Sequence, residues 1–157
     1  MSVTLRPATF EDIELFYRLQ QDPVAVWMAA FTSAELTDRS VFEARWRRVL
    51  GDASVDVRTV LVDAEAVGQV LTYPGEDGPE VSYWIDRDHW GRGHATEALR
   101  LLLAETTRRP VRAHAAQDNT RSVAVLVANG FRITGEDSGL AAGRGEVVKE
   151  YVLTLTD

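Results

Sequence analysis

The sequence predicts a mixed α/β domain, because the spacing of its apolar residues changes along the chain. In the first third they recur at intervals of three and four, as in amphipathic helices. From residue 55 the interval becomes two, which is typical of half-buried strands, and after residue 86 the two patterns alternate. No linker or internal repeat divides the 157 residues. We therefore expect a single domain, 1–157, with a mostly antiparallel sheet flanked by helices.

Local signals place the elements of the first third. Thr9 followed by Asp12 resembles a capping box at a helix start, Pro23 ends that helix, and Gly51 ends a later one. The apolar run before residue 32 fits either a short helix or a loop. The expected elements are a strand at 3–7, a helix from 9 to about 22, a helix or loop at 24–31, and a helix from 37 or 38 to about 50.

The pattern of the remaining two thirds predicts strands joined by turns, followed by alternating helices and strands. Turn residues at 63–65 and 75–79 connect three consecutive strands, which predicts antiparallel pairing. The residue before Pro110 marks the end of a strongly amphipathic helix. The expected elements are strands at 55–62, 67–74 and 80–85, a helix from about 95, a strand at 111–116, a helix from 119 or 120 to 129, and strands at 131–136 and 146–154.

Composition excludes several classes of function. Without cysteine, the chain has no disulfides, thiolate metal sites or cysteine nucleophile. The net charge is −7 and no basic run exceeds two residues, which favours cationic partners over nucleic acid, although the charge equally fits a role in solubility alone. The longest apolar run, 24–31, is far below the ~20 residues that span a bilayer, and no secretory segment opens the chain. We expect a cytoplasmic protein that binds no membrane.

The most informative segment joins the strand that ends at residue 85 to the helix that follows. Gly91 and Gly93 allow the backbone to turn tightly and to approach a ligand closely. The first turn of the helix presents unpaired N–H groups and the positive end of the helix dipole, and Arg92 adds a charge at the rim. The small side chain of Ala95 leaves these amides uncovered. The segment predicts a phosphate-binding loop, although a purely structural turn has the same pattern.

Two common nucleotide-binding motifs do not fit this loop. The phosphate loop of nucleotide triphosphatases requires Gly-Lys, and that pair does not occur in the chain. The dinucleotide fingerprint requires a third glycine where Thr96 stands and an acidic residue where 112–114 read Arg-Ala-His.

The segment Trp90-Gly91-Arg92-Gly93-His94-Ala95 resembles the acyl-CoA-binding motif Q/R-x-x-G-x-G/A of the GNAT superfamily of N-acetyltransferases. Trp in first position is usual in its ribosomal-protein alanine N-acetyltransferase-like branch. Residues 118–122 with 129–131 resemble the second family signature, N-x-x-S ending in G-F. The resemblance runs from about Leu5 to Leu155. It implies the GNAT fold, a sheet of about seven strands whose central strands splay apart.

The resemblance also implies acetyl-CoA as co-substrate, bound between the strands at 80–86 and 111–116. The pyrophosphate would lie on the amides of 92–96, and the pantetheine arm along 84–86. Asn119 would bind the pantetheine, although it equally fits a helix N-cap. The residues assigned to the cofactor are Trp84, Ile85, Asp86, Arg87, Gly91, Arg92, Gly93, His94, Ala95, Thr96, Asn119 and Ser122.

Attack by an amine requires a neutral nitrogen, so a base must remove a proton from the ammonium. Glu80, at the start of the strand that leads into the loop, matches the position of a catalytic glutamate in a number of family members, although a solvated turn residue also fits. Glu136 and Glu146 are alternative bases, because some members take their carboxylate from that region.

The departing thiolate needs a proton or a hydrogen-bond donor, and the thioester oxyanion needs a backbone N–H, expected near Trp84 or Ile85. Many members use a tyrosine in the last helix as the acid, but Leu126 stands there. Ser122 is therefore the candidate donor, unless the thiolate leaves stabilised by hydrogen bonds alone.

Four apolar residues fit either the core or a wall for the acceptor, and they are Trp27, Met28, Phe31 and Tyr73. The histidines suggest no metal site, since His89 and His94 do not share a helical face, and we expect His114 to be a strand residue facing a helix.

The predicted function is transfer of an acetyl group from acetyl-CoA to a primary amine, by direct attack in a ternary complex. The acceptor is a protein N-terminal α-amine or a small-molecule amine, and a homodimer is compatible with the chain. The alternative is a non-catalytic acyl-CoA sensor on the same fold.

Overall fold

The structure is a computed structural model that describes residues 2–157. Its sheet contains seven strands in the order β1-β2-β3-β4-β5-β7-β6, and only the β4–β5 pair is parallel. The strands are β1 (Val3–Pro7), β2 (Asp56–Val62), β3 (Glu65–Gly75), β4 (Gly78–Ile85), β5 (Val111–Ala116), β6 (Arg132–Ala141) and β7 (Glu146–Leu155). The α-helices are α1 (Ile13–Gln20), α2 (Pro23–Ala29), α3 (Arg39–Gly51), α4 (His94–Glu105) and α5 (Thr120–Ala128).

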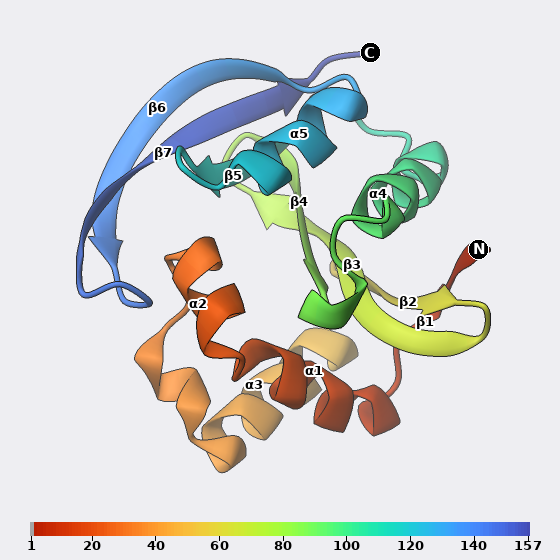
Figure 1. The fold of residues 1–157 in the computed structure, drawn as a ribbon. Helices are drawn as coiled ribbons and strands as arrows, with labels where there is room; N and C mark the ends of the chain where they lie inside the picture. The colour runs from red at the N-terminus through yellow and green to blue at the C-terminus, as the bar shows by residue number, and fades with distance from the viewer. Residues whose placement is uncertain (1) are drawn as a thin grey trace.

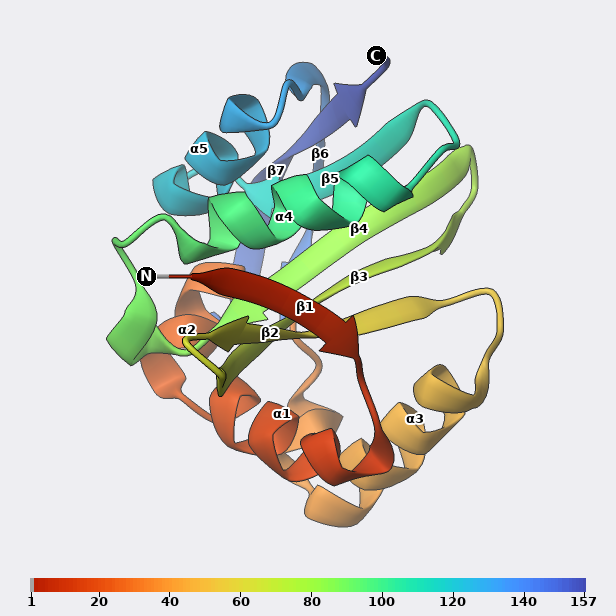
Figure 2. The ribbon, with the colours of Figure 1, turned by 90° about the vertical axis from the view of Figure 1, so that its right-hand side faces the viewer.

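Helices cover both faces of the sheet (Figures 1 and 2). The two faces have separate cores because successive strand residues point in opposite directions. On β3, Val70 packs with Leu99 and Leu102 of α4, whereas the neighbouring Leu71 packs with the cluster around Phe42 of α3. The α/β layer architecture expected from the sequence is confirmed.

The parallel strands β4 and β5 separate soon after they begin. Their register contains one pair, Glu80 with Arg112, whereas β3 pairs with β4 over eight positions and β5 with β7 over six. The two strands therefore diverge toward their carboxyl ends, which leaves backbone groups on both strands without a strand partner. The expected splay of the central strands is confirmed.

The N-terminal helices begin where the sequence predicts. Asp12 accepts a hydrogen bond from the Thr9 amide at 2.9 Å, and this capping box opens a short 3₁₀ turn, Phe10–Asp12, that continues into α1. The apolar run after residue 22 is a helix, α2, because Asp22 caps it and Pro23 occupies its first position. It ends at Ala29.

The largest difference from the predicted boundaries lies in the last hairpin. We expected a strand to end at residue 136, but β6 continues to Ala141 and pairs with β7 as far as Glu146, in a long curved hairpin (Figure 1). Residues 135–139 include two glycines and three polar residues, a composition typical of turns, and cross-strand pairing overrides this local preference. Within residues 2–157, no helix has the length and apolar content needed to cross a membrane.

Candidate active site

A cavity of about 720 Å³ lies where β4 and β5 separate. Its walls come from both faces of the sheet, since α2 and β3 contribute on one side and the 89–93 loop, α4 and α5 on the other. Figure 1 shows the gap between β4 and β5 with α2 below it and α5 above it. The cavity therefore reaches from one face of the sheet to the other.

The glycine loop forms one end of this cavity. Gly91 and Gly93 both have positive φ, +76° and +80°, which glycine adopts without strain. Gly93 is the N-cap of α4, and the first intrahelical hydrogen bond runs from Glu97 N to its carbonyl oxygen. The amides of residues 94–96 thus have no intrahelical acceptor, and the placement of a pyrophosphate on the amides of 92–96 stays a prediction.

An arginine that the sequence analysis did not assign lies at the glycine-loop end of the cavity. The guanidinium of Arg121, in the first turn of α5, lies 5.3 Å from the centre of the Trp90 ring and faces Gly91. Trp90 is itself fixed by a 2.8 Å hydrogen bond from its indole nitrogen to the Ile85 carbonyl. Arg121 lines the cavity, whereas Arg92 does not. Sequence reasoning missed Arg121, whose signal was its place within the second family signature.

Along β4, every second peptide group points away from β3 and into the gap between β4 and β5. Asp86 N bonds to Val67 O on β3, and alternation along an antiparallel ladder places the peptide groups of Trp84 toward β3 as well. Those of Tyr83 and Ile85 then point toward β5, into the gap. The Ile85 amide is therefore the better-placed of the two donors expected for an oxyanion.

Nine of the twelve residues assigned to the cofactor line the cavity. They are Trp84, Ile85, Gly91, Gly93, His94, Ala95, Thr96, Asn119 and Ser122. The other three lie outside its lining. The Asp86 side chain caps the 3₁₀ turn Arg87–His89 through Asp88 N, Arg87 pairs with Asp22 at 3.1 Å, and Arg92 is exposed.

Asn119 acts as the helix cap that the sequence allowed. Its Oδ1 accepts from Ser122 N and its Nδ2 donates to Met28 O, both at 3.2 Å. One amide therefore caps α5 and also connects it to α2 across the cavity.

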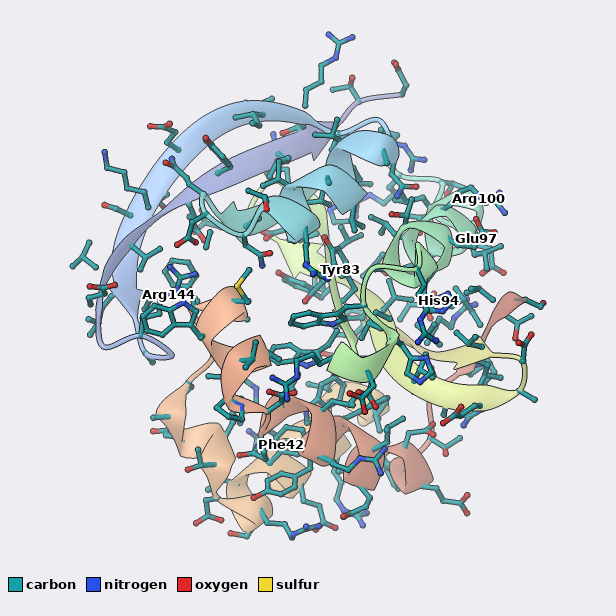
Figure 3. The ribbon with its side chains drawn as sticks, in the orientation of Figure 1. Phe42, Tyr83, His94, Glu97, Arg100 and Arg144 are labelled. Carbon is teal, nitrogen blue, oxygen red and sulfur yellow. The ribbon has the colours of Figure 1, made fainter. Side chains whose placement is uncertain are left out.

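The buried side chain of Arg144, 3% exposed, anchors α2 from the β6–β7 turn (Figure 3). It donates to both carboxylate oxygens of Asp118 at 2.6 and 2.8 Å and to Trp27 O at 2.7 Å. The Trp27 ring lies against this guanidinium, is 49% exposed and does not line the cavity. Trp27 is therefore not part of the core, and its place in an acceptor wall stays a prediction.

Ser122 is paired with a residue that the sequence did not single out. The hydroxyl of Tyr83, on β4, lies 2.7 Å from Ser122 Oγ and donates to Ser122 O at 3.0 Å. Burial raises the pKa of Tyr83 to about 12. Figure 3 shows Tyr83 near the centre of the molecule, beside the start of α5. Both side chains line the cavity, so a pair of neutral hydroxyls is available there.

The end of the cavity opposite the glycine loop is lined by Tyr73 and His114, and we refer to it as the acidic end because the carboxylates of Glu80 and Glu150 lie behind these two side chains. Tyr73 donates to Glu80 Oε1 at 3.4 Å, and both His114 and Tyr73 line the cavity together with Met28 and Phe31. Burial and the nearby charge of Glu80 raise the pKa of Tyr73 to about 12. Glu80 itself is not part of the lining.

His114 is on a strand, as predicted. Its neighbours Ala113 and Ala115 pack in the core beneath α4, so alternation places His114 on the opposite face, where α2 also packs on β5. There its ring lies 3.2 Å from each of two carboxylates, those of Glu80 and Glu150. The alternative bases Glu136 and Glu146 are exposed and outside the cavity lining.

Two further histidines lie beside the glycine loop. His94 is 4% exposed, and burial, with smaller effects from His89 and Arg92, lowers its pKa. His94 Nε2 and His89 Nδ1 are buried without a hydrogen-bond partner among the described residues. No group of three or more acidic, histidine or cysteine side chains within 2–157 is arranged to hold a metal ion.

The family model of the acetyltransferase (GNAT) domain matches residues 2–132. The chain belongs to the GNAT acetyltransferase family. The match covers the glycine loop and the splayed strands, and it confirms the fold and the enzyme class expected from the sequence. No functionally curated protein matches this GNAT chain by sequence.

Solved structures share the fold over the whole GNAT domain. The microcin C7 self-immunity acetyltransferase MccE, in complex with acetyl-CoA and AMP, is 16% identical, with a TM-score of 0.81 over 99% of this chain and 92% of its own. A ribosomal-protein-alanine N-acetyltransferase from Brucella melitensis is 19% identical, with a TM-score of 0.81 over 98% and 99%. A probable acetyltransferase is 25% identical, with a TM-score of 0.77 over 98% and 92%.

Proposed function

We propose that this GNAT enzyme transfers an acetyl group from acetyl-CoA to a primary amine by direct attack in a ternary complex. The observation that carries the proposal is a cavity with an amide-lined end at Gly91, Gly93 and Arg121 and an opposite end lined by Tyr73 and His114, with the carboxylate of Glu80 behind them. The first end suits the pyrophosphate of coenzyme A, and the second suits an ammonium. Acetyl-CoA is also the ligand named with MccE.

The cofactor residues follow from this arrangement. The amides of 94–96 and Arg121 bind the pyrophosphate, while the peptide groups of Tyr83 and Ile85 bind the pantetheine as an added strand would. The Ile85 amide is close to where the thioester oxygen becomes an oxyanion. Ser122 donates a hydrogen bond to the departing sulfur while the Tyr83 hydroxyl donates to Ser122 Oγ, one of the two donor directions that their 2.7 Å contact allows.

The acceptor amine enters beside Met28, Phe31 and Tyr73, which form an apolar wall. Glu80, the base predicted from the sequence, lies behind Tyr73 and His114 and provides the negative charge that favours removal of a proton. A protein N-terminal α-amine is one acceptor class, as in the ribosomal-protein alanine branch, and a small-molecule amine is the other. The Brucella melitensis protein, named for ribosomal-protein alanine, supports the first class.

An amine panel tests the proposal. Purified protein is incubated with acetyl-CoA and spermidine, free amino acids, an aminoglycoside or peptides with different first residues, and thiol release is measured. We expect at least one amine to raise thiol release well above the rate without acceptor. Background release with every amine, together with tight acetyl-CoA binding, would instead favour the acyl-CoA sensor.

A further inference from the structure

The imidazole of His114 lies between two carboxylates. Nε2 is 3.2 Å from Glu80 Oε1, and Nδ1 is 3.2 Å from Glu150 Oε1. The His114 side chain is 37% exposed, whereas each carboxylate is 18% exposed. The ring also lines the cavity, and neither carboxylate does. An acceptor in the cavity therefore meets the imidazole before it meets Glu80 or Glu150.

The strand registers bring these three residues together. Glu80 of β4 pairs with Arg112, two positions before His114 on β5, so the two side chains lie on the same face. Ala116 pairs with Glu150 of β7, which makes Glu150 the diagonal neighbour of His114 on that face. The arrangement depends on two strand pairings and does not involve a flexible loop.

The carboxylate of Glu80 is enclosed on the other sides. Tyr73 donates to its Oε1, and Gly75 on β3 lies so close that a Cβ there would collide with Oε2. The absence of a side chain at Gly75 thus leaves room for the carboxylate in its position behind the ring. Glu80 is placed to support His114 and does not reach into the cavity itself.

We propose that His114 is the catalytic base that takes the proton from the acceptor ammonium, with Glu80 and Glu150 as positioning residues. The inference rests on the proposed acetyl transfer. Ionised carboxylates only accept hydrogen bonds, and a neutral imidazole carries one N–H. A neutral imidazole can therefore donate to only one of the two carboxylates, the other ring nitrogen keeps its lone pair as the proton acceptor, and the imidazolium that forms has a carboxylate beside each nitrogen.

The proton balance closes with the residues present. One N–H bond of the ammonium breaks as the proton moves to the unprotonated ring nitrogen of His114, from which it passes to solvent. The freed electron pair forms the C–N bond with the thioester carbon, and the C–S bond breaks. The nitrogen then loses its second proton, which ends on the coenzyme A sulfur. The products are the amide, free coenzyme A and one proton.

The test compares His114→Gln with Glu80→Gln, Glu150→Gln and Glu65→Gln, using the fastest acceptor of the amine panel. Glu65 is an exposed carboxylate outside the cavity lining and serves as the control. We expect His114→Gln to lower kcat by about 100-fold or more, the range of general base catalysis, without changing the thermal shift given by acetyl-CoA. Glu65→Gln should match the wild type.

The pH profile separates a base from a structural residue. The titratable and charged groups around His114 are Tyr73 on β3, Glu80 on β4, Glu150 on β7 and, on the same face of its own strand, Arg112. Arg45 of α3 lines the same cavity, and α2, which also packs on β5, contains no titratable group. A base must be unprotonated to accept the proton, so wild-type activity should rise with pH to a plateau. That rise should be absent in His114→Gln and displaced in Glu80→Gln and Glu150→Gln.

Rescue by a small molecule provides the second readout. In His114→Ala, added imidazole should restore part of the lost turnover, while leaving the wild type unaffected. Wild-type kcat and an unchanged pH profile in His114→Gln, with activity lost in Glu80→Gln, would overturn this inference and make Glu80 the direct base. A wild type that acetylates no amine would overturn the proposed function as well.

Discussion

The hydroxyl of Tyr83 lies 2.7 Å from the hydroxyl of Ser122, and the pair lines the cavity between the glycine loop and the acidic end. Tyr83 comes from β4 and Ser122 from the first turn of α5. The family resemblance implies that a tyrosine of the last helix protonates the departing thiolate in many members. Leu126 occupies that position in this chain. A tyrosine from a different element therefore supplies a phenol near Ser122.

Removing the Ser122 hydroxyl should slow the chemical step. We expect Ser122→Ala to lower kcat by about tenfold, because a single hydrogen bond to a charged group contributes about 1.5 kcal/mol. The dissociation constant for acetyl-CoA should change little. Single-turnover kinetics and calorimetry measure the two quantities, and an unchanged kcat would remove Ser122 from the leaving-group site.

Alkaline titration should unfold the protein partly through Tyr83. Burial raises the pKa of Tyr83 to about 12, above the ordinary value of 10.0. Its neutral form therefore contributes stability that is fully present below pH 10 and is lost as the pH rises toward 12. Tyr83→Phe should flatten the stability curve between these values, as followed by urea unfolding at several pH values. Equal slopes in both proteins would contradict the prediction.

A charge placed in the glycine loop should prevent acetyl-CoA binding. Gly93→Asp puts a carboxylate beside the amides of 94–96, and Gly93→Asn is the matched neutral control. Asn also tolerates positive φ, and a Cβ at Gly93 meets no atom within 4 Å. The thermal shift given by acetyl-CoA should nearly vanish in Gly93→Asp and largely persist in Gly93→Asn. Identical shifts in both variants would exclude this loop as the pyrophosphate site.

Arg121 rather than Arg92 should dominate the cationic contribution to acetyl-CoA binding. Arg121 lines the cavity above Trp90, whereas Arg92 is exposed outside it. Losing one charged hydrogen bond costs about 1.5 to 3 kcal/mol, so Arg121→Ala should weaken binding by about 10- to 100-fold. Arg92→Ala should stay within about threefold of the wild type. Calorimetry measures the dissociation constant of acetyl-CoA for each variant. A larger loss of affinity in Arg92→Ala than in Arg121→Ala would place the phosphates beside Arg92.

The ionised carboxylate of Asp12 should stabilise the folded protein, and this contribution should be lost at acid pH. Burial disfavours its charged form, but hydrogen bonds from Arg6, Thr9 N and Thr59 outweigh that effect and lower its pKa. Its contribution is therefore present above the unfolded-state pKa and is lost as pH falls through the lower folded-state value. Asp12→Asn should lower the free energy of unfolding by about 2 kcal/mol at pH 7, or Tm by about 4–8 °C. The difference in stability between variant and wild type should become smaller below about pH 4. A gap independent of pH would show that packing, not ionisation, is responsible.

The sequence by itself determined the glycine loop, the helix behind it and the family. These features depend on neighbours within a few residues: positive φ at Gly91 and Gly93, and unpaired amides in the first turn of α4. Only the tertiary structure decided which side chains meet at the acidic end. Glu80, His114 and Glu150 come from three strands and are joined by the β4–β5 and β5–β7 registers. Such pairings are set by packing of the whole sheet, which no local pattern encodes.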